Sequence, residues 1–418
     1  MSLTEFLLSK KENMMKKFLI IASALTALFA TSAVSFAACN FTPSGKLTLL
    51  ANSYAAWKAV SDAMGECGNF EAELDAEFRK KQPDAFAANP SLYQLGGISN
   101  STIQPLLSAG TIRALDDLVA KYGQDLQPNQ LIRINGQIMA IAMSVNNQHL
   151  MYREDVLNSL GIAVPQTYYE LLSAVDKIAA SGQVDYALGG TYKAGWNLAE
   201  EFVNMYLGMG GQFFKGTQPS VNNVMGIRTL EMMRNLTHYM DPEYLVADST
   251  YVQQQFQQGK IAIANLWATR AAAMDDEKES QVVGKVKMAA APYPVTGALP
   301  ASTLWWDGVV LAKNMTDQQA DEAFQLLMEG IDKEMVRENN DLAVWLINGY
   351  EPGPMATGAA ETAENGAVPY PNGMEMGLMH TALGNNIADF LTGKETADQT
   401  LKDIEAEYIT AAKEKGLL

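Results

Sequence analysis

The sequence is poor in the residues that build metal centres and poor in positive charge. Its 418 residues include three histidines and two cysteines, which excludes zinc fingers, cysteine-ligated clusters and histidine-rich metal sites. It has 30 Lys and Arg against 47 Asp and Glu, a formal net charge of −17. Such an acidic chain lacks the electrostatic footprint of proteins that bind nucleic acids or anionic membranes. We therefore predict a soluble protein without metal or cofactor that binds an uncharged or cationic ligand.

The chain also lacks the common catalytic motifs. It contains no G-x-G-x-x-G or G-x-x-x-x-G-K-[ST] phosphate loop and no G-x-S-x-G nucleophile elbow. None of its histidines has a partner at i, i+4, so a zinc-peptidase motif is excluded. We interpret its acidic pairs as solvated faces, namely Asp116-Asp117, Glu200-Glu201 and Asp275-Asp276. These absences predict that the protein is not an enzyme.

Only one long apolar run is present, Phe18–Phe29, and it follows the basic pair Lys16-Lys17. Small residues come next and include Ser35-Phe36-Ala37, a small-x-small cleavage site. This is the order of a secretory signal peptide, which we assign to residues 1–37. A membrane helix is the alternative, but the run is short and carries Ser and Thr. Because no second apolar run reaches about 18 residues, we expect the mature chain in the periplasm.

The two cysteines, Cys39 and Cys67, both lie near the amino terminus of a mature chain that would begin at Ala38. In an oxidising compartment we expect a disulfide between them. In the chain-entropy model such a loop stabilises the fold by about 3–4 kcal/mol. The alternative is a lipid anchor on Cys39, but Phe36, three places before it, fits a lipobox poorly. We favour the disulfide.

Strand and helix patterns alternate along the mature chain. Short apolar runs predict strands at residues 46–51, 93–98, 186–188, 261–267, 286–291 and 309–312, and a strand or extended segment at 70–78. Asn135-Gly136 predicts the turn of a hairpin, and Thr167 with Glu170 forms a capping box that opens a helix. No Pro/Ser linker divides the chain. This order predicts two α/β domains, joined by several chain crossings, with a mainly parallel sheet.

Six tryptophans are the strongest functional signal, and four of them lie at the ends of predicted elements. In α/β proteins ligands bind at strand ends and between domains, and an indole face packs well against the C–H face of a sugar ring. Trp57 and Trp345 have apolar neighbours at helical spacing, so we interpret them as core. Our candidate ligand-binding residues are Trp267, Trp306, Asp307, Trp305, Trp196, Arg270, Asn100, Tyr54 and Asn147.

Five segments of the mature chain occur in a characteristic order: 135–142, 150–157, 160–172, 256–263 and 306–312. The third, with the pattern G-x-x-x-P-x-T-Y-x-E-L-L, is the most specific. Together they resemble the bacterial extracellular solute-binding proteins of family 1, the maltose-binding-protein-like receptors of ABC importers. Two departures are visible. Residues 373–379 lack the aromatic of some maltose binders, which argues against maltodextrin, and residues 78–90 fit the family pattern poorly.

The resemblance implies a two-lobed periplasmic-binding-protein fold with a hinge and a ligand cleft between the lobes. Its crossing pattern places lobe 1 at residues 44–146 plus 300–332 and lobe 2 at residues 147–299 plus 333–418. It also implies a monomeric periplasmic receptor that closes on a small neutral carbohydrate or polyol and presents it to an ABC permease in the inner membrane. Trp267 lies where family members place an aromatic after the strand that follows Gly259-Lys260, and Trp306 lies where they place a glycine or an aromatic before the next strand.

Two alternatives stay open. The first is a secreted carbohydrate-active enzyme, a glycoside hydrolase or lyase, which needs two carboxylates about 5–10 Å apart in the cleft. The second keeps the fold and binds a peptide, a polyamine or a metal chelate. Acidic side chains crowding the cleft would favour a cation, whereas indoles flanked by amides would favour a sugar.

Overall fold

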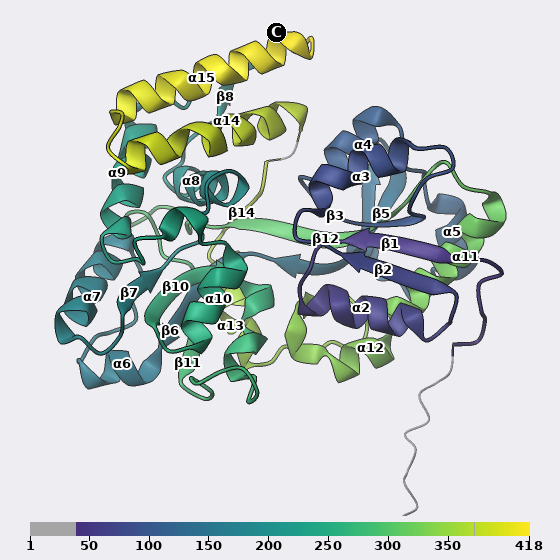
Figure 1. Ribbon diagram of the computed structural model, residues 1–418, viewed down its shortest axis with the longest axis horizontal. Coiled ribbons are helices and arrows are strands. Elements are labelled where there is room, and N and C mark those ends of the chain that lie inside the picture. The colour runs from purple at the N-terminus through teal and green to yellow at the C-terminus, as the bar shows by residue number, and fades with distance from the viewer. Residues whose placement is uncertain (1–38, 372) are drawn as a thin grey trace, which may run out of the picture. The chain divides into compact units, whose positions relative to one another are not determined.

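The computed structural model describes residues 39–371 and 373–418 (Figure 1). The predicted signal peptide, residues 1–37, therefore lies outside the described residues. Residues Thr42–Leu418 form one compact unit built on two main β-sheets. Within the described ranges, no helix is both long enough and apolar enough to cross a membrane.

The first sheet has the strand order β13-β5-β12-β3-β1-β2. Its strand β1 (Leu47–Ala51) pairs in parallel with β2 (Phe70–Leu74) and β3 (Leu95–Ser99). The long strand β12 (Thr303–Leu311) lies antiparallel to both β3 and β5 (Gln137–Asn146). Three short strands complete the sheet, namely β4 (Leu131–Ile134), β13 (Val344–Trp345) and β14 (Val368–Pro369).

The second sheet has the order β11-β6-β10-β7. These strands are β6 (Gln148–Arg153), β7 (Tyr186–Gly189), β10 (Ile261–Trp267) and β11 (Val286–Ala289), and a separate hairpin joins β8 (Phe214–Lys215) to β9 (Gln218–Pro219). In this sheet only β10 and β7 are parallel. The prediction of a mainly parallel sheet was therefore wrong. Local patterns locate strands, but their direction follows from the β4–β5 hairpin and from β12 returning against β3.

Helices surround both sheets (Figure 1). The first half of the chain contributes α2 (Ala55–Gly65), α3 (Phe78–Ala87), α4 (Ile103–Ala109), α5 (Asp116–Tyr122), α6 (Glu154–Ser159), α7 (Tyr168–Ser181) and α8 (Trp196–Gly208). The second half contributes α9 (Val224–Thr237), α10 (Ser249–Gln257), α11 (Asp317–Gly330), α12 (Lys333–Glu338), α13 (Thr357–Glu364), α14 (Met374–Leu391) and α15 (Ala397–Glu414).

Local chemistry explains several boundaries. Asn135 and Gly136 have φ of 51° and 82°, which confirms the predicted turn between β4 and β5. The predicted capping box is also present, since Thr167 Oγ1 accepts the backbone N–H of Glu170 at 3.2 Å. The predicted strand at 70–78 is too long. It ends at Leu74, and the chain then turns into α3.

The chain passes between the two sheets more than once. It leaves β5 at Asn146 and enters β6 at Gln148, so a single residue joins the two sheets there. It returns along β12 and remains with the first sheet through α12, which contacts α2, and through β13, which pairs with β5. It then reaches α13, which packs on β6 and β11 of the second sheet.

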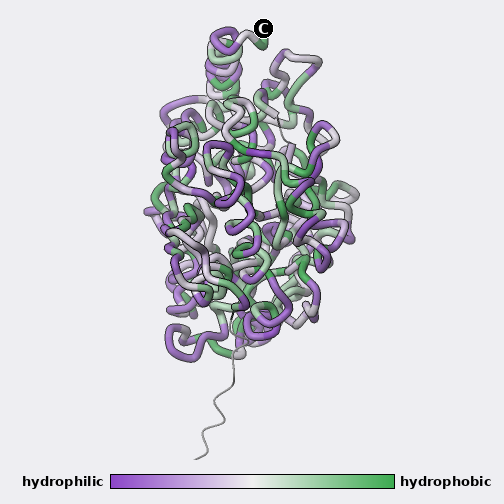
Figure 2. The backbone as a smooth tube through the Cα atoms, turned by 90° about the vertical axis from the view of Figure 1, so that its right-hand side faces the viewer, coloured by the Kyte–Doolittle hydropathy of each residue, from purple (hydrophilic) through white to green (hydrophobic). Residues whose placement is uncertain are grey.

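Apolar residues collect on both sheets. Figure 2 shows hydrophilic and hydrophobic stretches interspersed along the tube. Trp57 and Trp345 are buried with 1% and 3% of their surface exposed, which confirms their interpretation as core residues. Trp345, however, lies in the short strand β13 rather than in a helix.

Candidate functional site

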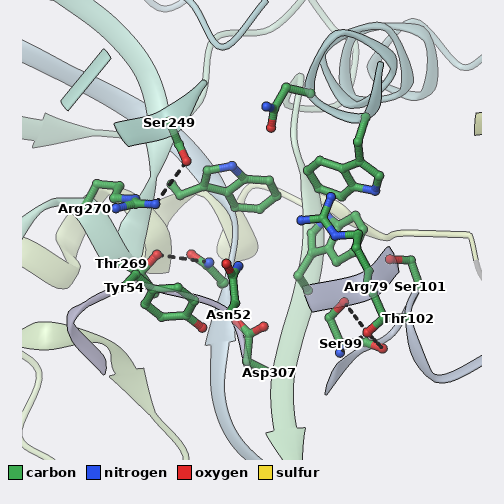
Figure 3. Close-up of a pocket in the computed structure, with 15 residues that line it drawn as sticks. Asn52, Tyr54, Arg79, Ser99, Ser101, Thr102, Ser249, Thr269, Arg270 and Asp307 are labelled. Atoms are coloured by element: carbon green, nitrogen blue, oxygen red, sulfur yellow. Dashed lines mark hydrogen bonds between the residues drawn. The ribbon is translucent and has the colours of Figure 1, made fainter. Parts of the chain in front are cut away.

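A cavity of about 90 Å³ lies where ends of strands from both sheets meet (Figure 3). Side chains at strand ends point out of the sheet, and in α/β folds such positions form ligand sites. The lining residues are Asn52, Tyr54, Arg79, Ser99, Ser101, Thr102, Asn146, Trp196, Asn197, Ser249, Trp267, Thr269, Arg270, Trp305 and Asp307. The first sheet and α3 supply one side, and the second sheet with α8 and α10 supplies the other.

Three indoles form the apolar part of the cavity wall. Trp196 stacks on Trp267 with ring centroids 6.4 Å apart and an angle of 29° between the planes. Trp305 meets both edge-on, at 5.5 Å from Trp196 and 5.8 Å from Trp267. These are favourable aromatic geometries, so the cluster holds its shape without a ligand. It offers flat apolar surface of the kind that binds the C–H face of a carbohydrate.

The backbone before Trp196 depends on glycine. Gly195 has φ of 93° and lies against Gly384 of α14, where an added Cβ would come within 2.6 Å of the Gly195 oxygen. His380, also on α14, lies with Nε2 3.0 Å from the Trp196 oxygen and Nδ1 2.8 Å from the Tyr370 hydroxyl. Burial lowers the pKa of His380 to about 4, so the ring is neutral near pH 7. Both contacts fix the start of α8 and thereby the Trp196 ring.

Strand β12 sends its side chains alternately to two faces. Trp305 and Asp307 line the cavity, whereas Trp306 packs, half-buried, against the apolar cluster that contains Ile98 and Leu106. Successive side chains of a strand point to opposite faces, so these neighbours cannot share one surface. The structure thus places the candidate Trp306 outside the cavity, and its neighbour Trp305 inside.

Several polar atoms of the cavity wall have no partner among the described residues. They are Tyr54 Oη, Arg79 Nε and Asn146 Oδ1, each shielded from solvent. A buried polar group without a hydrogen bond costs free energy, so native proteins satisfy nearly all of them. These three atoms face one cavity, where a ligand can bond to them, and Tyr54 Oη also lies close to the Asp307 carboxyl. Among the described residues, five more unpartnered atoms belong to side chains that do not line the cavity, namely Ser144 Oγ, Asn147 Oδ1, His149 Nε2, Glu200 Oε2 and Asn265 Oδ1.

Tyr54 and Asp307 face each other across the cavity floor (Figure 3). Burial raises the pKa of the Asp307 carboxyl to about 7, and the hydroxyl of Tyr54 and the charge of Arg79 oppose that rise. Burial, together with the charge of Asp307, raises the pKa of Tyr54 well above its ordinary value. Near neutral pH the hydroxyl is therefore protonated, and Asp307 exchanges between its charged and neutral forms.

Arginines flank the cavity on opposite sides (Figure 3). Arg79, near the start of α3, has its guanidinium carbon 4.5 Å from the centre of the Trp196 ring, a cation–π contact. Arg270 follows β10 and donates to Gln253 Oε1 and Ser249 Oγ, both at 3.1 Å. Burial lowers the pKa of both guanidinium groups without neutralising them.

A second polar cluster lies on the other side of Trp305. Its indole Nε1 donates to Glu200 Oε1 at 3.1 Å and to Thr303 Oγ1 at 2.8 Å. Glu201, the next residue of α8, accepts from Gln148 Nε2 at 3.0 Å and from the Thr191 hydroxyl. Both carboxyls are buried, which raises the pKa of Glu201 to about 7 and that of Glu200 well above its ordinary value. The interpretation of Glu200-Glu201 as a solvated pair was wrong, because α8 is buried on several sides.

Comparison with known proteins identifies the family. A family model for bacterial extracellular solute-binding proteins matches residues 81–327, more than half of the chain. The chain belongs to this family. Its members are extracellular, so the protein works in the periplasm or as a secreted protein.

Solved structures agree with the fold of this solute-binding protein. An ABC transporter solute-binding protein of Agrobacterium radiobacter K84, in complex with ribitol, is 21% identical with a TM-score of 0.77, over 88% of this chain and 99% of that one. One of Agrobacterium vitis S4 with bound D-mannitol is 20% identical with a TM-score of 0.75, over 89% and 99%. Maltose-bound MalE3 of T. maritima is 17% identical with a TM-score of 0.75, over 88% and 99%. The two-lobed binding-protein fold predicted from the sequence is confirmed.

Most candidate residues of the solute-binding protein meet at the cavity. Those that line it are Trp267, Asp307, Trp305, Trp196, Arg270 and Tyr54. The other three do not line it. Asn100 lies beneath β12, where its side chain is 3.3 Å from the Leu304 oxygen and 3.4 Å from the Trp306 nitrogen. Asn147 donates to the Ala359 oxygen at 3.0 Å, and Trp306 packs on the apolar cluster of the first sheet.

The sequence interpretation missed the polar half of the wall, namely Asn52, Arg79, Ser99, Ser101, Thr102, Asn146, Asn197, Ser249 and Thr269. Some signals were available. Asn146 ends the long strand β5, and Asn52 follows β1, which are positions that face a ligand in α/β folds. Arg79 carried no local signal, because its approach to Trp196 depends on how α3 and α8 meet. Within the described residues, no group of three or more His, Cys, Asp or Glu could hold a metal ion.

Proposed function

We propose that this solute-binding protein is the receptor of an ABC importer and that it binds a small carbohydrate or polyol in the cavity. The observation that supports the proposal is the combination of three indoles with three unpartnered polar atoms on one surface. Indole faces bind the C–H side of a sugar, while Tyr54, Arg79, Asn146 and Asp307 can bind its hydroxyl groups. The sugars and polyols in the similar solved structures support the same class of ligand.

Residues 373–379 contain no aromatic that would extend the stacking surface, which favours a short ligand. The volume of the cavity does not set the same limit. The cavity of about 90 Å³ adjoins a larger one of about 480 Å³, and both are lined by Asn52, Arg79, Trp196, Asn197, Ser249 and Arg270.

Closure of the two lobes around the ligand is the proposed mechanism. We propose the lobes expected from the sequence, with one change. Lobe 1 comprises about residues 44–146 plus 300–345, and lobe 2 comprises about residues 147–299 plus 346–418. The chain leaves lobe 1 after Trp345 rather than after residue 332, because β13 pairs with β5. Contacts already cross the cavity, since Arg79 lies on Trp196 and Lys193 lies 3.9 Å from Glu77. The ion pair is exposed and contributes little energy, so ligand contacts would supply most of the driving force.

An enzymatic role is the weaker candidate. Glycoside hydrolysis uses two carboxylates, and among the described cavity residues Asp307 is the one acid. We therefore propose a receptor without catalytic activity. Incubation of the protein with its ligand should return the ligand unchanged by mass spectrometry, and a hydrolysed or eliminated product would contradict this.

A thermal-shift screen over sugars and polyols tests the main proposal. A ligand at 100 times its Kd adds about 2.7 kcal/mol to the free energy of unfolding, so the melting temperature should rise by several degrees. The variant Trp196→Ala should lose the shift. The control Trp306→Phe, outside the cavity, should keep it. The proposal fails if no compound of the panel shifts the wild type, or if Trp196→Ala responds as the wild type does.

We also propose a monomer that meets its permease in the inner membrane, begins at Ala38 after processing and has a Cys39–Cys67 disulfide. Neither cysteine is free among the described residues. Native mass spectrometry of the purified protein should give the monomer mass. Intact mass before and after alkylation should show no added label until the protein is reduced. A labelled native protein or a diacylated Cys39 would contradict the disulfide.

A further inference from the structure

The charge of the cavity wall is unbalanced. Two guanidinium groups, Arg79 and Arg270, line it together with one carboxyl, Asp307. Asp307 can balance at most one of them, so these three side chains have a net charge of at least +1. Glu77 and Asp248 line the adjoining cavity and act on Arg79 and Arg270 from beyond ion-pair distance, but Lys80 and Lys193 line it too, so the excess of positive charge remains. This stands out in a chain whose formal net charge is −17. Arginine stays protonated in proteins, so the imbalance persists over the physiological pH range.

Neither arginine has an acidic partner at ion-pair distance. Over residues 39–371 and 373–418, Arg79 makes no hydrogen bond or ion pair, its Nε is shielded from solvent, and its contacts are the Trp196 and Phe78 rings. Arg270 donates to two neutral side chains, Gln253 and Ser249. Four of the other six arginines differ, whereas Arg228 and Arg234, outside the cavity, also have no ion pair among the described residues. Arg113, Arg133, Arg153 and Arg337 each lie within 4 Å of a carboxylate oxygen.

Burying an uncompensated charge is costly, and proteins normally pair it. A neutral sugar would satisfy some donors of these guanidinium groups but would leave the charge in place. A carboxylate removes both costs, because its two oxygens match the fork of a guanidinium group. A carboxylate charge of −1 also matches the net +1 of the wall, whereas a phosphate ester carries about −1.5 to −2 near pH 7.

We propose that the physiological ligand is a polyhydroxylated monocarboxylate, an aldonate or a uronate, whose carboxylate binds Arg79 and Arg270 while its hydroxyl-bearing chain or ring lies against the indoles. This rests on the proposed function and refines its ligand from a neutral to an acidic sugar. Because α3 and the segment after β10 approach the cavity from opposite sides, closure brings two like charges together (Figure 3). The anion offsets that repulsion and so favours the closed form.

Matched ligand pairs test the proposal by isothermal titration calorimetry at low salt. The pairs are D-mannonate with D-mannitol, D-ribonate with ribitol, D-galacturonate with D-galactose and D-glucuronate with D-glucose. In at least one pair the acid should bind tenfold or more tightly than its neutral partner. Arg79→Gln should reduce affinity for that acid at least tenfold and affinity for the neutral partner less than threefold. Arg133→Gln, an exposed arginine outside the cavity, serves as the matched control and should leave both unchanged.

The results distinguish the proposed sugar or polyol receptor from the proposed acidic ligand. If neutral sugars or polyols bind as well as their acids, the proposed function stands and the acidic ligand is refuted. If a sugar phosphate such as D-mannose 6-phosphate binds more tightly than every acid, the carboxylate assignment is wrong. If no member of the panel binds, the proposed function fails as well. Melting curves of each variant without ligand establish that a loss of affinity is not a loss of folding.

Discussion

Trp305 lies between two buried polar regions, one that lines the cavity and one whose side chains bond mainly to other protein groups. On the cavity side Tyr54 Oη, Arg79 Nε and Asn146 Oδ1 have no partner among the described residues. On the other side Thr303 Oγ1 lies 2.9 Å from Glu200 Oε1 and 2.7 Å from Asn204 Oδ1, while Glu200 Oε2 has no partner among the described residues. Both regions contain carboxyls with raised pKa values.

The two regions show two uses of buried polarity. The Glu200 cluster, which comprises Glu200, Thr303 and Asn204, ties α8 to the start of β12 and to Gln148 at the crossing between the sheets, since Asn204 Nδ2 donates to Gln148 Oε1 at 3.0 Å. Its hydrogen bonds are part of the fold and hold Trp305 in place. The unpartnered atoms of the cavity face a space that a ligand can fill, so their cost can be recovered on binding. Glu200 has a raised pKa and an unpartnered Oε2 but does not line the cavity, so neither feature identifies a ligand site without a cavity beside it.

The largest expected effect concerns Asp307 and pH. Because burial raises its pKa to about 7, the folded protein keeps a proton on this carboxyl that the unfolded chain releases near pH 4. Its contribution to the free energy of unfolding therefore falls as pH rises from about 4 to 7, by up to about 4 kcal/mol. Asp307→Asn cannot titrate, so its stability relative to the wild type should rise by about 3 kcal/mol between pH 4.5 and 8, because part of the effect is already lost at pH 4.5. Urea unfolding at both pH values measures the gain.

The exposed residue Asp317 provides the control for that experiment. Asp317→Asn, at a side chain that is 100% exposed, should change the free energy of unfolding much less than Asp307→Asn does. An Asp307→Asn variant whose stability relative to the wild type does not change with pH would show that the carboxyl is hydrated rather than buried.

The next largest effect is expected in the Glu200 cluster. Glu200→Ala removes the acceptor of Thr303 and Trp305 and leaves a hole, so the free energy of unfolding should fall by about 3 kcal/mol. Glu200→Gln keeps an acceptor oxygen and the same size, and should cost less than about 1 kcal/mol. Urea unfolding at pH 7 compares the two. Equal losses would mean that the charge of Glu200, not its hydrogen bonds, stabilises the protein.

A smaller effect, on affinity rather than stability, is expected from the aromatic wall. Trp196→Ala removes the indole that stacks on Trp267 and supports Arg79, so ligand affinity should fall by about 2 kcal/mol, roughly thirtyfold. Titration calorimetry with the ligand from the screen gives the ratio. Wild-type affinity in a folded Trp196→Ala variant would place the ligand elsewhere.

The smallest effect is expected at Trp306. Because its side chain packs on the first sheet, Trp306→Phe should change ligand affinity less than twofold while it lowers the melting temperature slightly. Trp305→Phe should weaken binding more, since it loses both the cavity surface and the bond to Glu200. If Trp306→Phe weakens binding more than Trp305→Phe does, then Trp306 rather than Trp305 faces the ligand.

Local chemistry determined what the sequence could predict. The Asn135-Gly136 turn and the Thr167 cap depend on neighbours a few residues away, so both were predicted correctly. Trp267 was also located, because it ends a strand. The sequence could not show whether Trp305 or Trp306 faces the ligand. Successive side chains of a strand point to opposite faces, but the sequence pattern does not say which face lines the cavity.

Contacts between distant elements determined the rest. The position of Arg79 depends on how α3 packs. The sequence pattern predicted an extended segment through residue 78, whereas the strand ends at Leu74 and α3 begins at Phe78. Glu200-Glu201 looked like a solvated pair until α8 was seen to be packed by α9 and α14. Strand direction likewise came from pairings such as that of Trp305 with Asn146, far apart in the sequence.

The crystal structure of the complex with the ligand from the screen tests the central claim most directly. The account predicts ligand oxygens within about 2.7–3.2 Å of Arg79 Nε, Asn146 Oδ1 and Tyr54 Oη, with the C–H face of the ligand against the indole cluster. The hydrogen bonds of Glu200 and Thr303 should be unchanged. A ligand bound outside this cavity, with those three atoms still unpartnered, would contradict the account.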